Sequence, residues 1–358
     1  MTNIQELAEK TGVSVATVSR ALNGSPEVSE ATRERILALA RELDYTPSAA
    51  ARTLVSSRSH VIGVILETGA GHPDLMHPFF QQVLVGLKHG AGERGYDLLL
   101  FSSDEPGNGF GGTHSYVRRA GHHGVDGVVV MGYDPSDPEM RALVASGVPC
   151  ITIDADPGEP HCGYVMSENR DGAAQAVRHL HELGHTRIAT ITGPPRTRPG
   201  LDRLEGYREE MERLGVEVRD EYVIEGDFYD ESGYRTTRKL LELAEPPTAV
   251  FAASDLMAAG ALRAANELGV RVPEDLAVVG FDDITVAALI QPALTTIRQD
   301  MHSIGEAAAE GLGRMIDDPD AEPVKALAPV RLVVRSSSLP QGAPRERTLA
   351  TDKEVREH

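Results

Sequence analysis

The chain has 358 residues, 41% hydrophobic and 25% charged, a composition typical of folded globular proteins and a length suited to two or three domains. With neither a long apolar run nor a signal-peptide-like start, the sequence favours a cytoplasmic protein with no membrane partner. The formal net charge of −19 argues against a protein that coats nucleic acid non-specifically.

The first elements along the chain are three short helices, placed by residues that favour helix N-termini. The helices are expected over residues 4–10, 15–22 and 30–43, and their N-caps are Asn3, Ser14 and Ser29. Gly12 allows the chain to reverse between the first two helices, which predicts a helix-turn-helix. The same spacing also occurs by chance in other small helical bundles.

The residues around and after this segment favour the first interpretation. Three motifs stand in order: Gly-Val-Ser-Val-Ala-Thr-Val-Ser-Arg-Ala-Leu-Asn at 12–23, Val-Ser-Glu-Ala-Thr-Arg at 28–33, and Leu-Asp-Tyr-Thr-Pro-Ser at 43–48. With them the chain resembles the lactose-repressor (LacI/GalR) family, and the resemblance continues to about Ser338. It implies a sequence-specific DNA-binding transcriptional regulator, commonly a repressor, controlled by a small-molecule effector.

The resemblance also implies which residues contact double-stranded operator DNA. The second helix would present some side chains to base edges and others to phosphates, and a hinge helix over 48–55 would insert an apolar side chain into the minor groove. The implied residues are Ser14, Val15, Ala16, Thr17, Ser19, Arg20, Asn23, Ala51 and Leu54. Residues 1–59 hold seven basic and seven acidic side chains, so binding is expected to be weaker or more salt-sensitive than is usual.

Beyond residue 60 the sequence alternates β-branched apolar runs with segments of helical periodicity. Residues 60–66 are typical of a strand buried on both faces, and residues 79–93 have helical spacing. Further strands are expected at 96–102, 127–131, 150–154, 187–192, 248–252 and 276–281. This alternation predicts an α/β fold of doubly wound parallel sheets, with enough elements for two lobes.

The resemblance implies how the chain divides, with a periplasmic-binding-protein-like core that binds the effector between its lobes. The expected parts are a helix-turn-helix headpiece (1–45), a hinge helix and linker (46–59), a core (60–340) whose lobe one is 60–166 with 298–328 and whose lobe two is 167–297 with 329–340, and a disordered tail (341–358). A homodimer on a pseudo-palindromic operator is implied, and no heptad repeat for tetramers is visible.

Side chains at the expected strand ends are candidates for effector binding. Arg203 and Asp282 match family positions that hydrogen-bond ligand hydroxyls, and Phe228 would offer an aromatic face to a sugar ring. The other candidates are His77, Phe79, Asp154, Ser254 and Asp255. Asp255 could equally cap the helix that follows it. An arginine, carboxylates and an aromatic plate together favour a sugar or oligosaccharide.

A purine effector is disfavoured by two positions. The purine-binding branch of the family uses an arginine and a threonine there, and this chain has Thr197 and Pro199. Two other functions remain as alternatives. An uptake binding protein would need a signal peptide and no headpiece, and a sugar-processing enzyme would turn its ligand over.

Two motifs suggest other chemistry but lack the expected context. Residues 181–185 read His-Glu-Leu-Gly-His, the zinc-protease pattern, but Gly184 is expected to end the helix and so separate the two histidines. Residues 107–112 fit the dinucleotide pattern but lie in a long loop. No catalytic constellation, metal site or cofactor is therefore expected, and the protein is expected not to be an enzyme.

Overall fold

The structure is a computed structural model that describes residues 3–22, 25–43, 45, 58–66, 74–102, 115–339 and 356–357. The chain forms two compact units, which are described separately. One comprises Met1–His60 with Gly124–Asp126, and the other Val61–His123 with Gly127–His358.

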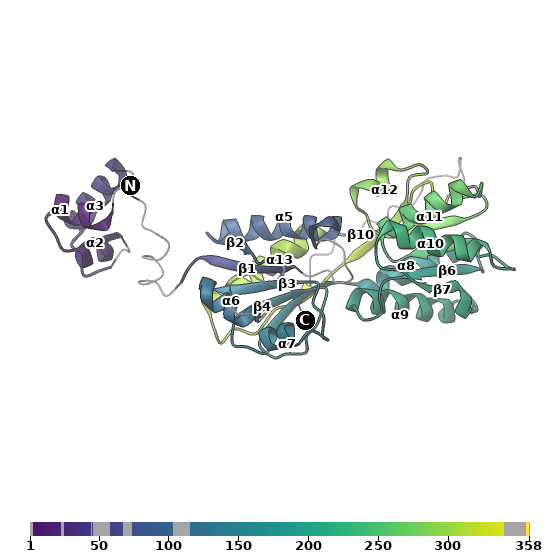
Figure 1. Ribbon diagram of the computed structural model, residues 1–358, viewed down its shortest axis with the longest axis horizontal. Helices are drawn as coiled ribbons and strands as arrows, with labels where there is room; N and C mark the ends of the chain where they lie inside the picture. The colour runs from purple at the N-terminus through teal and green to yellow at the C-terminus, as the bar shows by residue number, and fades with distance from the viewer. Residues whose placement is uncertain are drawn as a thin grey trace. The chain divides into compact units, whose positions relative to one another are not determined.

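The N-terminal unit contains the three helices expected from the sequence, shown in purple in Figure 1. They are α1 (Ile4–Thr11), α2 (Val15–Leu22) and α3 (Glu30–Glu42), so the prediction is confirmed to within one residue at each end. The predicted caps are present: the Asn3 side chain accepts from the Glu6 amide, and Ser14 Oγ accepts from the Thr17 amide at 3.1 Å. Ser29 likewise accepts from the Thr32 amide.

A small apolar core holds these helices together. Leu7, Val18 and Ile36, one from each helix, are completely buried. Ala8 and Ala21 pack beside them, so the helices meet at small side chains. Because this core uses one face of α2, the opposite face is left to solvent, and Val15 remains 41% exposed.

The second unit is built on two sheets. Sheet A has the order β13-β11-β5-β4-β3-β1-β2, and all its strands are parallel except β13. Its strands are β1 (Val61–Leu66), β2 (Asp97–Leu100), β3 (Gly127–Met131), β4 (Cys150–Ile153), β5 (Cys162–Ser167), β11 (Lys325–Ala328) and β13 (Arg356–Glu357).

Sheet B has the order β12-β10-β9-β8-β6-β7 and is parallel except for β12. Its strands are β6 (Ile188–Thr192), β7 (Val223–Glu225), β8 (Ala249–Ala252), β9 (Ala277–Asp282), β10 (Thr295–Gln299) and β12 (Val330–Val333). The predicted α/β class with parallel sheets is confirmed.

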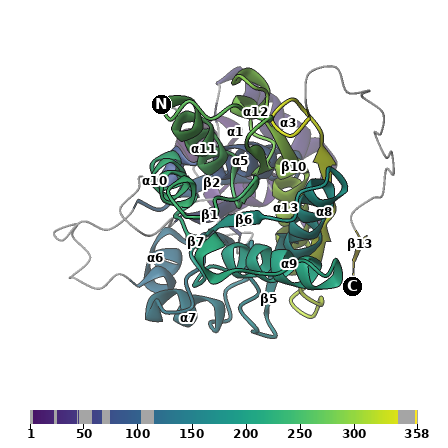
Figure 2. The same ribbon diagram turned by 90° about the vertical axis from the view of Figure 1, so that its right-hand side faces the viewer.

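Helices cover both faces of each sheet (Figure 1). Those of sheet A are α5 (Pro78–Glu93), α6 (Tyr116–His123), α7 (Pro138–Val144) and α13 (Met301–Asp317). Those of sheet B are α8 (Asn169–Glu182), α9 (Arg198–Arg213), α10 (Asp230–Leu241), α11 (Asp255–Glu267) and α12 (Thr285–Leu289). Figure 2 shows α8 beside α9 on one side of sheet B and α10 with α11 on the other.

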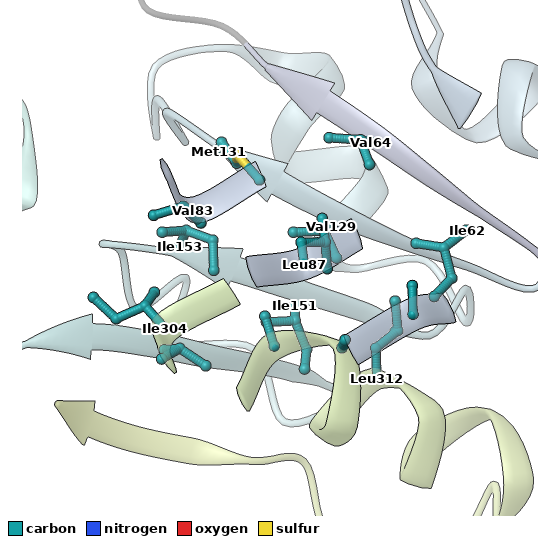
Figure 3. Packing of buried hydrophobic residues seen from close by; sticks show 14 of the residues in the cluster. Ile62, Val64, Val83, Leu87, Val129, Met131, Ile151, Ile153, Ile304 and Leu312 are labelled. Atoms are coloured by element: carbon teal, nitrogen blue, oxygen red, sulfur yellow. The ribbon is translucent and has the colours of Figure 1, made fainter. Parts of the chain in front are cut away.

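Alternate residues of the strands enter separate cores, as a sheet buried on both faces requires. In β8, Val250 packs with α10 and α11, whereas Phe251 packs with α8 and α9. In sheet A, Val129 and Ile151 pack against Leu87 of α5 and Leu312 of α13 (Figure 3). The β-branched runs noted in the sequence supply most of these side chains.

The chain crosses between the two sheets three times. It passes from β5 of sheet A to α8, from β10 of sheet B to α13, and from β11 of sheet A to β12 of sheet B. We call residues 167–169, 299–301 and 328–330 the crossovers. Sheet A with its helices is lobe one, and sheet B with its helices is lobe two.

The C-terminal residues depart in part from the sequence expectation. Residues 341–358 were expected to be a disordered tail, but Arg356–Glu357 pair antiparallel with β11 as strand β13. The others lie outside the described residues, as do residues 107–112 with the dinucleotide-like pattern. Among the helices of the described residues, none combines the length and apolar character needed to cross a membrane.

Candidate effector cavity and DNA-reading helix

A cavity of about 290 Å³ is lined by both lobes. Its lining residues follow the carboxyl ends of β3 and β4 in lobe one and of β6, β7 and β9 in lobe two. This is where open α/β sheets bind ligands, since the strand ends and the following loops converge there. Six of the eight candidates from the sequence line it: His77, Phe79, Asp154, Arg203, Phe228 and Asp282.

Arg203 is the central cation of the cavity and is only 4% exposed. Its Nε donates to Asn169 Oδ1 at 2.8 Å, and its Nη1 donates to the Ala253 carbonyl at 2.6 Å. The guanidinium lies 3.7 Å from the centre of the Phe281 ring. Burial lowers the pKa of Arg203, while Asp282 and Asp154 oppose that shift. The arginine is therefore held in a fixed orientation before any ligand arrives.

Asp282 faces Arg203 at the end of β9. Its Oδ1 lies 3.7 Å from Arg203 Nη1 and accepts from Gln299 Nε2 at 2.7 Å. Its Oδ2 is buried without a hydrogen-bond partner. Burial raises the pKa of Asp282 to about 7, although Arg203 works in the other direction. An unpartnered carboxylate oxygen in a buried site is costly unless a ligand hydroxyl supplies the missing bond.

Asp154 brings a second carboxylate to the same cavity. It follows β4, and burial raises its pKa while Arg203 lowers it. Its Oδ1 lies at 3.5 Å from the Ser167 amide of the first crossover. The hydroxyl of Ser167 is itself buried without a partner. Asp154 thus gives the cavity a second carboxylate beside Arg203, whereas Ser167 is not among the residues that line it.

Backbone strain marks the same residues. Asp154, Phe228 and Asp282 have φ values of 57°, 72° and 123°, a region that side-chain-bearing residues rarely adopt. Such conformations persist where the surrounding structure enforces them, and they concentrate at binding sites. The Phe228 ring also lies against Gly193, where an added Cβ would come within 2.0 Å of it. Gly193 is therefore needed for the aromatic face at this position.

His77 and Phe79 form part of the lobe-one wall, at the start of α5. His77 Nδ1 caps the helix by accepting from the Phe79 amide at 3.3 Å, and its Nε2 is buried without a partner. Burial, followed by the charge of Arg203, lowers the pKa of His77 to about 4, so the ring is neutral at physiological pH. The Phe79 ring packs edge-on against Phe80, with centroids 5.2 Å apart.

Ser254 and Asp255 are not among the residues that line the cavity. Ser254 Oγ donates to the Phe228 carbonyl at 2.9 Å and accepts from the Met257 amide, which caps α11. Asp255 is completely buried; it accepts from the Ile284 amide and bonds the Thr296 hydroxyl. Their polar atoms are engaged within lobe two, so their contribution to this site is structural support.

Several lining residues were not singled out from the sequence. They follow the same strand ends and are more exposed than Arg203 and Asp282: Tyr133, Asp134, Asp137, Arg196, Arg198, Asp227 and Tyr229. Asp134 accepts from the Ser136 amide and hydroxyl, which lowers its pKa. Tyr133, Asp134 and Asp137 follow β3, a strand that the sequence predicted, so the search for side chains after strand ends could have found them there too.

The zinc-protease pattern does not form its helix. α8 ends at Glu182, and Gly184 has a φ of 92°, so the chain leaves the helical path before His185. His185 Nδ1 instead lies 3.0 Å from the Thr248 hydroxyl. The two histidines do not share a helical face, as the glycine predicted.

The predicted DNA-contacting residues of α2 lie at its N-terminal end and along its exposed side. Val15, Ala16 and Arg20 are exposed, and Arg20 Nε is 3.4 Å from Glu27 Oε2. Ser14 and Thr17 share a hydrogen bond of 2.9 Å between their hydroxyls. Ser19 is half-buried. Asn23, Ala51 and Leu54 lie outside the described residues.

Comparison with known proteins gives matches along most of the chain. Residues 3–48 match bacterial regulatory proteins of the lacI family, and residues 177–338 match a periplasmic binding protein-like domain. The chain is 38% identical over 336 residues to the HTH-type transcriptional regulator CelR of Thermobifida fusca, covering 93% of this chain and 97% of that protein. It is 33% identical to the HTH-type transcriptional repressor PurR of Escherichia coli O139:H28, covering 94% and 97%.

Solved structures give the same picture. A complex of transcriptional regulator CelR with cellobiose is 34% identical and has a TM-score of 0.70, covering 94% of this chain and all of that one. The lac repressor dimer bound to operator and the anti-inducer ONPF is 29% identical, with a TM-score of 0.79, covering 94% and 99%. The likeness spans the helical unit and the two-sheet unit alike.

Proposed function

The chain belongs to the LacI family of bacterial regulatory proteins, and we propose that a saccharide bound between its two lobes sets its affinity for operator DNA. It is a DNA-binding transcriptional regulator, as CelR and PurR are. The proposal about the effector rests mainly on one observation. Asp282 and His77 each have a buried side-chain atom without a hydrogen-bond partner in the cavity that holds Arg203.

The DNA-reading role is assigned to residues 1–45, with residues 46–59 as the hinge helix and linker. The exposure of Val15, Ala16 and Arg20 on α2 supports their contact with base edges in the major groove. The hydroxyls of Ser14 and Thr17 stand at the helix N-terminus, where phosphate is favoured. We infer a homodimer with two such helices on a pseudo-palindromic operator, and repression as the outcome.

The chemistry of the cavity favours an uncharged polyol over a purine. Arg203 and two carboxylates of raised pKa can donate to and accept from several hydroxyls, and Phe228 can cover the apolar face of a sugar ring. A purine base would need donors directed at its edge. The Thr197 hydroxyl already donates to the Pro194 carbonyl, and Pro199 has no side-chain donor. The relative bound to cellobiose favours a disaccharide, so a short glucoside is the first candidate.

Effector binding can reach the DNA-binding unit through the crossovers. Asn169 and Gln299, which hold Arg203 and Asp282, lie in the first and second crossovers. A ligand that hydrogen-bonds Arg203 and Asp282 therefore acts, through Asn169 and Gln299, on the first and second crossovers, about which we propose that the lobes move. We propose that lobe closure alters the lobe-one surface of the dimer and so the placement of the hinge helices. Such coupling is reciprocal between effector and operator.

The test measures binding of the untagged protein to a labelled fragment from upstream of its own coding sequence. We expect at least ~1000-fold preference over a scrambled fragment, and a changed affinity when cellobiose is added. Arg20→Ala should weaken specific binding by about 10-fold or more, because a base contact is lost. Arg41→Ala, on the exposed part of α3, is the matched control and should change it little. Equal binding of cognate and scrambled DNA would refute the proposal.

The alternative of a sugar-processing enzyme has less support. The family consists of transcriptional regulators, and the cavity chemistry described above is suited to holding a polyol. We infer that the ligand leaves unchanged, which chromatography of the recovered sugar after prolonged incubation would test. As a DNA-binding transcriptional regulator, the protein is proposed to act in the cytoplasm.

A further inference from the structure

The two helices α5 and α13 touch along their backbones. An added Cβ at Gly86 would lie 2.0 Å from the carbonyl oxygen of His302, and one at Gly305 would lie 2.1 Å from that of Val83. Gly90 faces Ala309 in the same way, at 2.9 Å. Since any larger residue would push the helices apart, the spacing between them is fixed. Their inner faces are anchored in the lobe-one core (Figure 3).

Three metal-ligating side chains converge beside this contact, on the solvent side. His89 Nδ1 of α5 lies 2.6 Å from Glu306 Oε1 of α13. His302 Nδ1 lies 3.4 Å from Glu306 Oε2, one helical turn away on the same face. The two imidazole rings are 5.7 Å apart between centroids. All three side chains are accessible, with 56%, 47% and 36% exposure for His89, His302 and Glu306.

We propose that His89, His302 and Glu306 form a binding site for a divalent transition-metal ion, with zinc as the first candidate. Their ligand atoms all lie within 4.8 Å of one another. Tetrahedral zinc with bonds of about 2.0–2.1 Å separates its ligand atoms by roughly 3.4 Å, so small side-chain rotations suffice. Two imidazoles and a carboxylate favour zinc and its neighbours over calcium or magnesium, which prefer oxygen.

Glu93 completes the arrangement as a positioning residue. Its Oε1 lies 3.8 Å from His89 Nε2, one turn along α5. With Nδ1 directed at the metal, Nε2–H points to this carboxylate, the arrangement that orients metal-bound histidines and makes them better donors. The two glutamates also make the site locally anionic, which suits a divalent cation. The site is separate from the effector cavity and does not depend on the proposed function.

The rigidity of the two helices favours binding over simple ion pairing. Ligands carried by loops must be ordered when a metal binds, whereas these stand on helices whose contact the glycines fix. A bound ion would join α5 and α13 and so stabilise lobe one. Without an ion, Glu306 bridges the two histidines, and this weaker alternative is what the experiment distinguishes.

The experiment titrates the untagged full-length chain with Co²⁺, followed by its visible d–d absorption, and then with Zn²⁺ against a chromophoric chelator. We expect one ion per chain, bound at least 10-fold more weakly by the His89→Ala/His302→Ala double variant. The matched control is His122→Ala/His123→Ala, which removes an adjacent histidine pair from α6 and should leave binding unchanged.

Two further measurements separate a metal site from a structural role. Glu93→Gln should weaken zinc binding by about 10-fold without abolishing it, because it alters only the orientation and basicity of His89. Zinc should raise the unfolding temperature of the wild type but not of the double variant, while the two unfold alike in chelator. The proposal is overturned if the wild type binds no more tightly than the double variant, or if the control pair is the one whose loss abolishes binding.

Discussion

The buried and exposed parts of the cavity lining differ in how their side chains are held. In the buried part, Arg203 and Asp282 are each fixed by a crossover residue, and strained backbone sets the position of Asp282. In the exposed part, Arg196 lies in the loop after β6 and Arg198 begins α9. Arg198 pairs with Asp202 at 2.8 Å and remains 46% exposed.

This difference separates affinity from selectivity. Groups that are already oriented and desolvated lose little entropy on binding and act at low dielectric, so their hydrogen bonds contribute most to affinity. Exposed charges are screened by water and salt. The buried part should therefore decide whether a sugar binds, and the exposed part should distinguish between sugars of different length. The predictions below are ordered by expected effect.

The largest effect is expected for Arg203→Ala. Removing this cation leaves Asp282 and Asp154 buried without a compensating charge and deletes the central donor. Hydrogen bonds made by a buried charged group are worth up to about 3 kcal/mol, so saccharide affinity should fall by roughly 100-fold in calorimetry. The two uncompensated carboxylates should also lower the free energy of unfolding. Circular dichroism and operator binding check that the variant is folded. The saccharide affinity of Arg203→Lys should lie between that of the wild type and that of Arg203→Ala. Wild-type affinity in the alanine variant would show that Arg203 does not contact the ligand.

Two single substitutions, compared with each other, test which buried aspartate binds the ligand. Asp282→Asn should lower affinity by about 10–100-fold, because the oxygen left unpartnered in the free protein becomes part of a weaker, neutral hydrogen-bonding group. Asp255→Asn should change it by less than about 3-fold, since an amide can still accept from Ile284 and donate to Thr296. Calorimetry measures the saccharide affinity of both variants. A larger loss for Asp255→Asn than for Asp282→Asn would mean that Asp255, and not Asp282, binds the ligand.

The same contrast shows what the sequence could and could not predict about the site. Asp154 and Asp282 stand at the ends of apolar runs that are easily recognised as strands. Phe228 was instead proposed from the family resemblance, because the short strand β7 that precedes it was not predicted. Ser254 follows such a run too, but its side chain turns back to cap α11. A sequence gives the position of a residue after a strand, and only the backbone conformation there gives the direction of its side chain.

The supporting residues could not be found by the same reasoning. Asn169 and Gln299 belong to crossovers, and their partners lie 34 and 17 positions away in the chain. The strands that lead to the crossovers were also missed: β5 contains Gly163 and Tyr164, and β10 is largely polar, so neither has the β-branched apolar pattern. The predicted strands were those with continuous apolar runs, including β2, whose residues are exposed or half-buried. β5 and β10 are mostly buried but lack such a run.

The pH dependence of saccharide binding should come from the buried part of the cavity lining and not from the exposed part. With a pKa of about 7, Asp282 of the free protein is largely protonated at pH 6 and ionised at pH 8. If the ligand bonds the carboxylate, its affinity should fall by about 10-fold between pH 8 and pH 6. His77, with a pKa of about 4, and Asp134, whose pKa is lowered, do not titrate in this window. Asp282→Asn should reduce the dependence to any contribution from Asp154, whose pKa burial also raises. A flat wild-type profile would contradict the prediction.

The smallest effect is expected for Arg196→Ala, in the exposed part. Its guanidinium lines the cavity but is open to solvent, so its contribution should not exceed about 1 kcal/mol, or roughly 5-fold in affinity. Because it stands apart from the buried groups, the loss should appear with a disaccharide and be absent with a monosaccharide, and it should shrink at high salt. Arg271→Ala, an exposed arginine paired with Asp275 outside the cavity lining, is the control. An equal loss of affinity for the monosaccharide and the disaccharide would mean that the exposed part of the lining contacts the same sugar unit as the buried part.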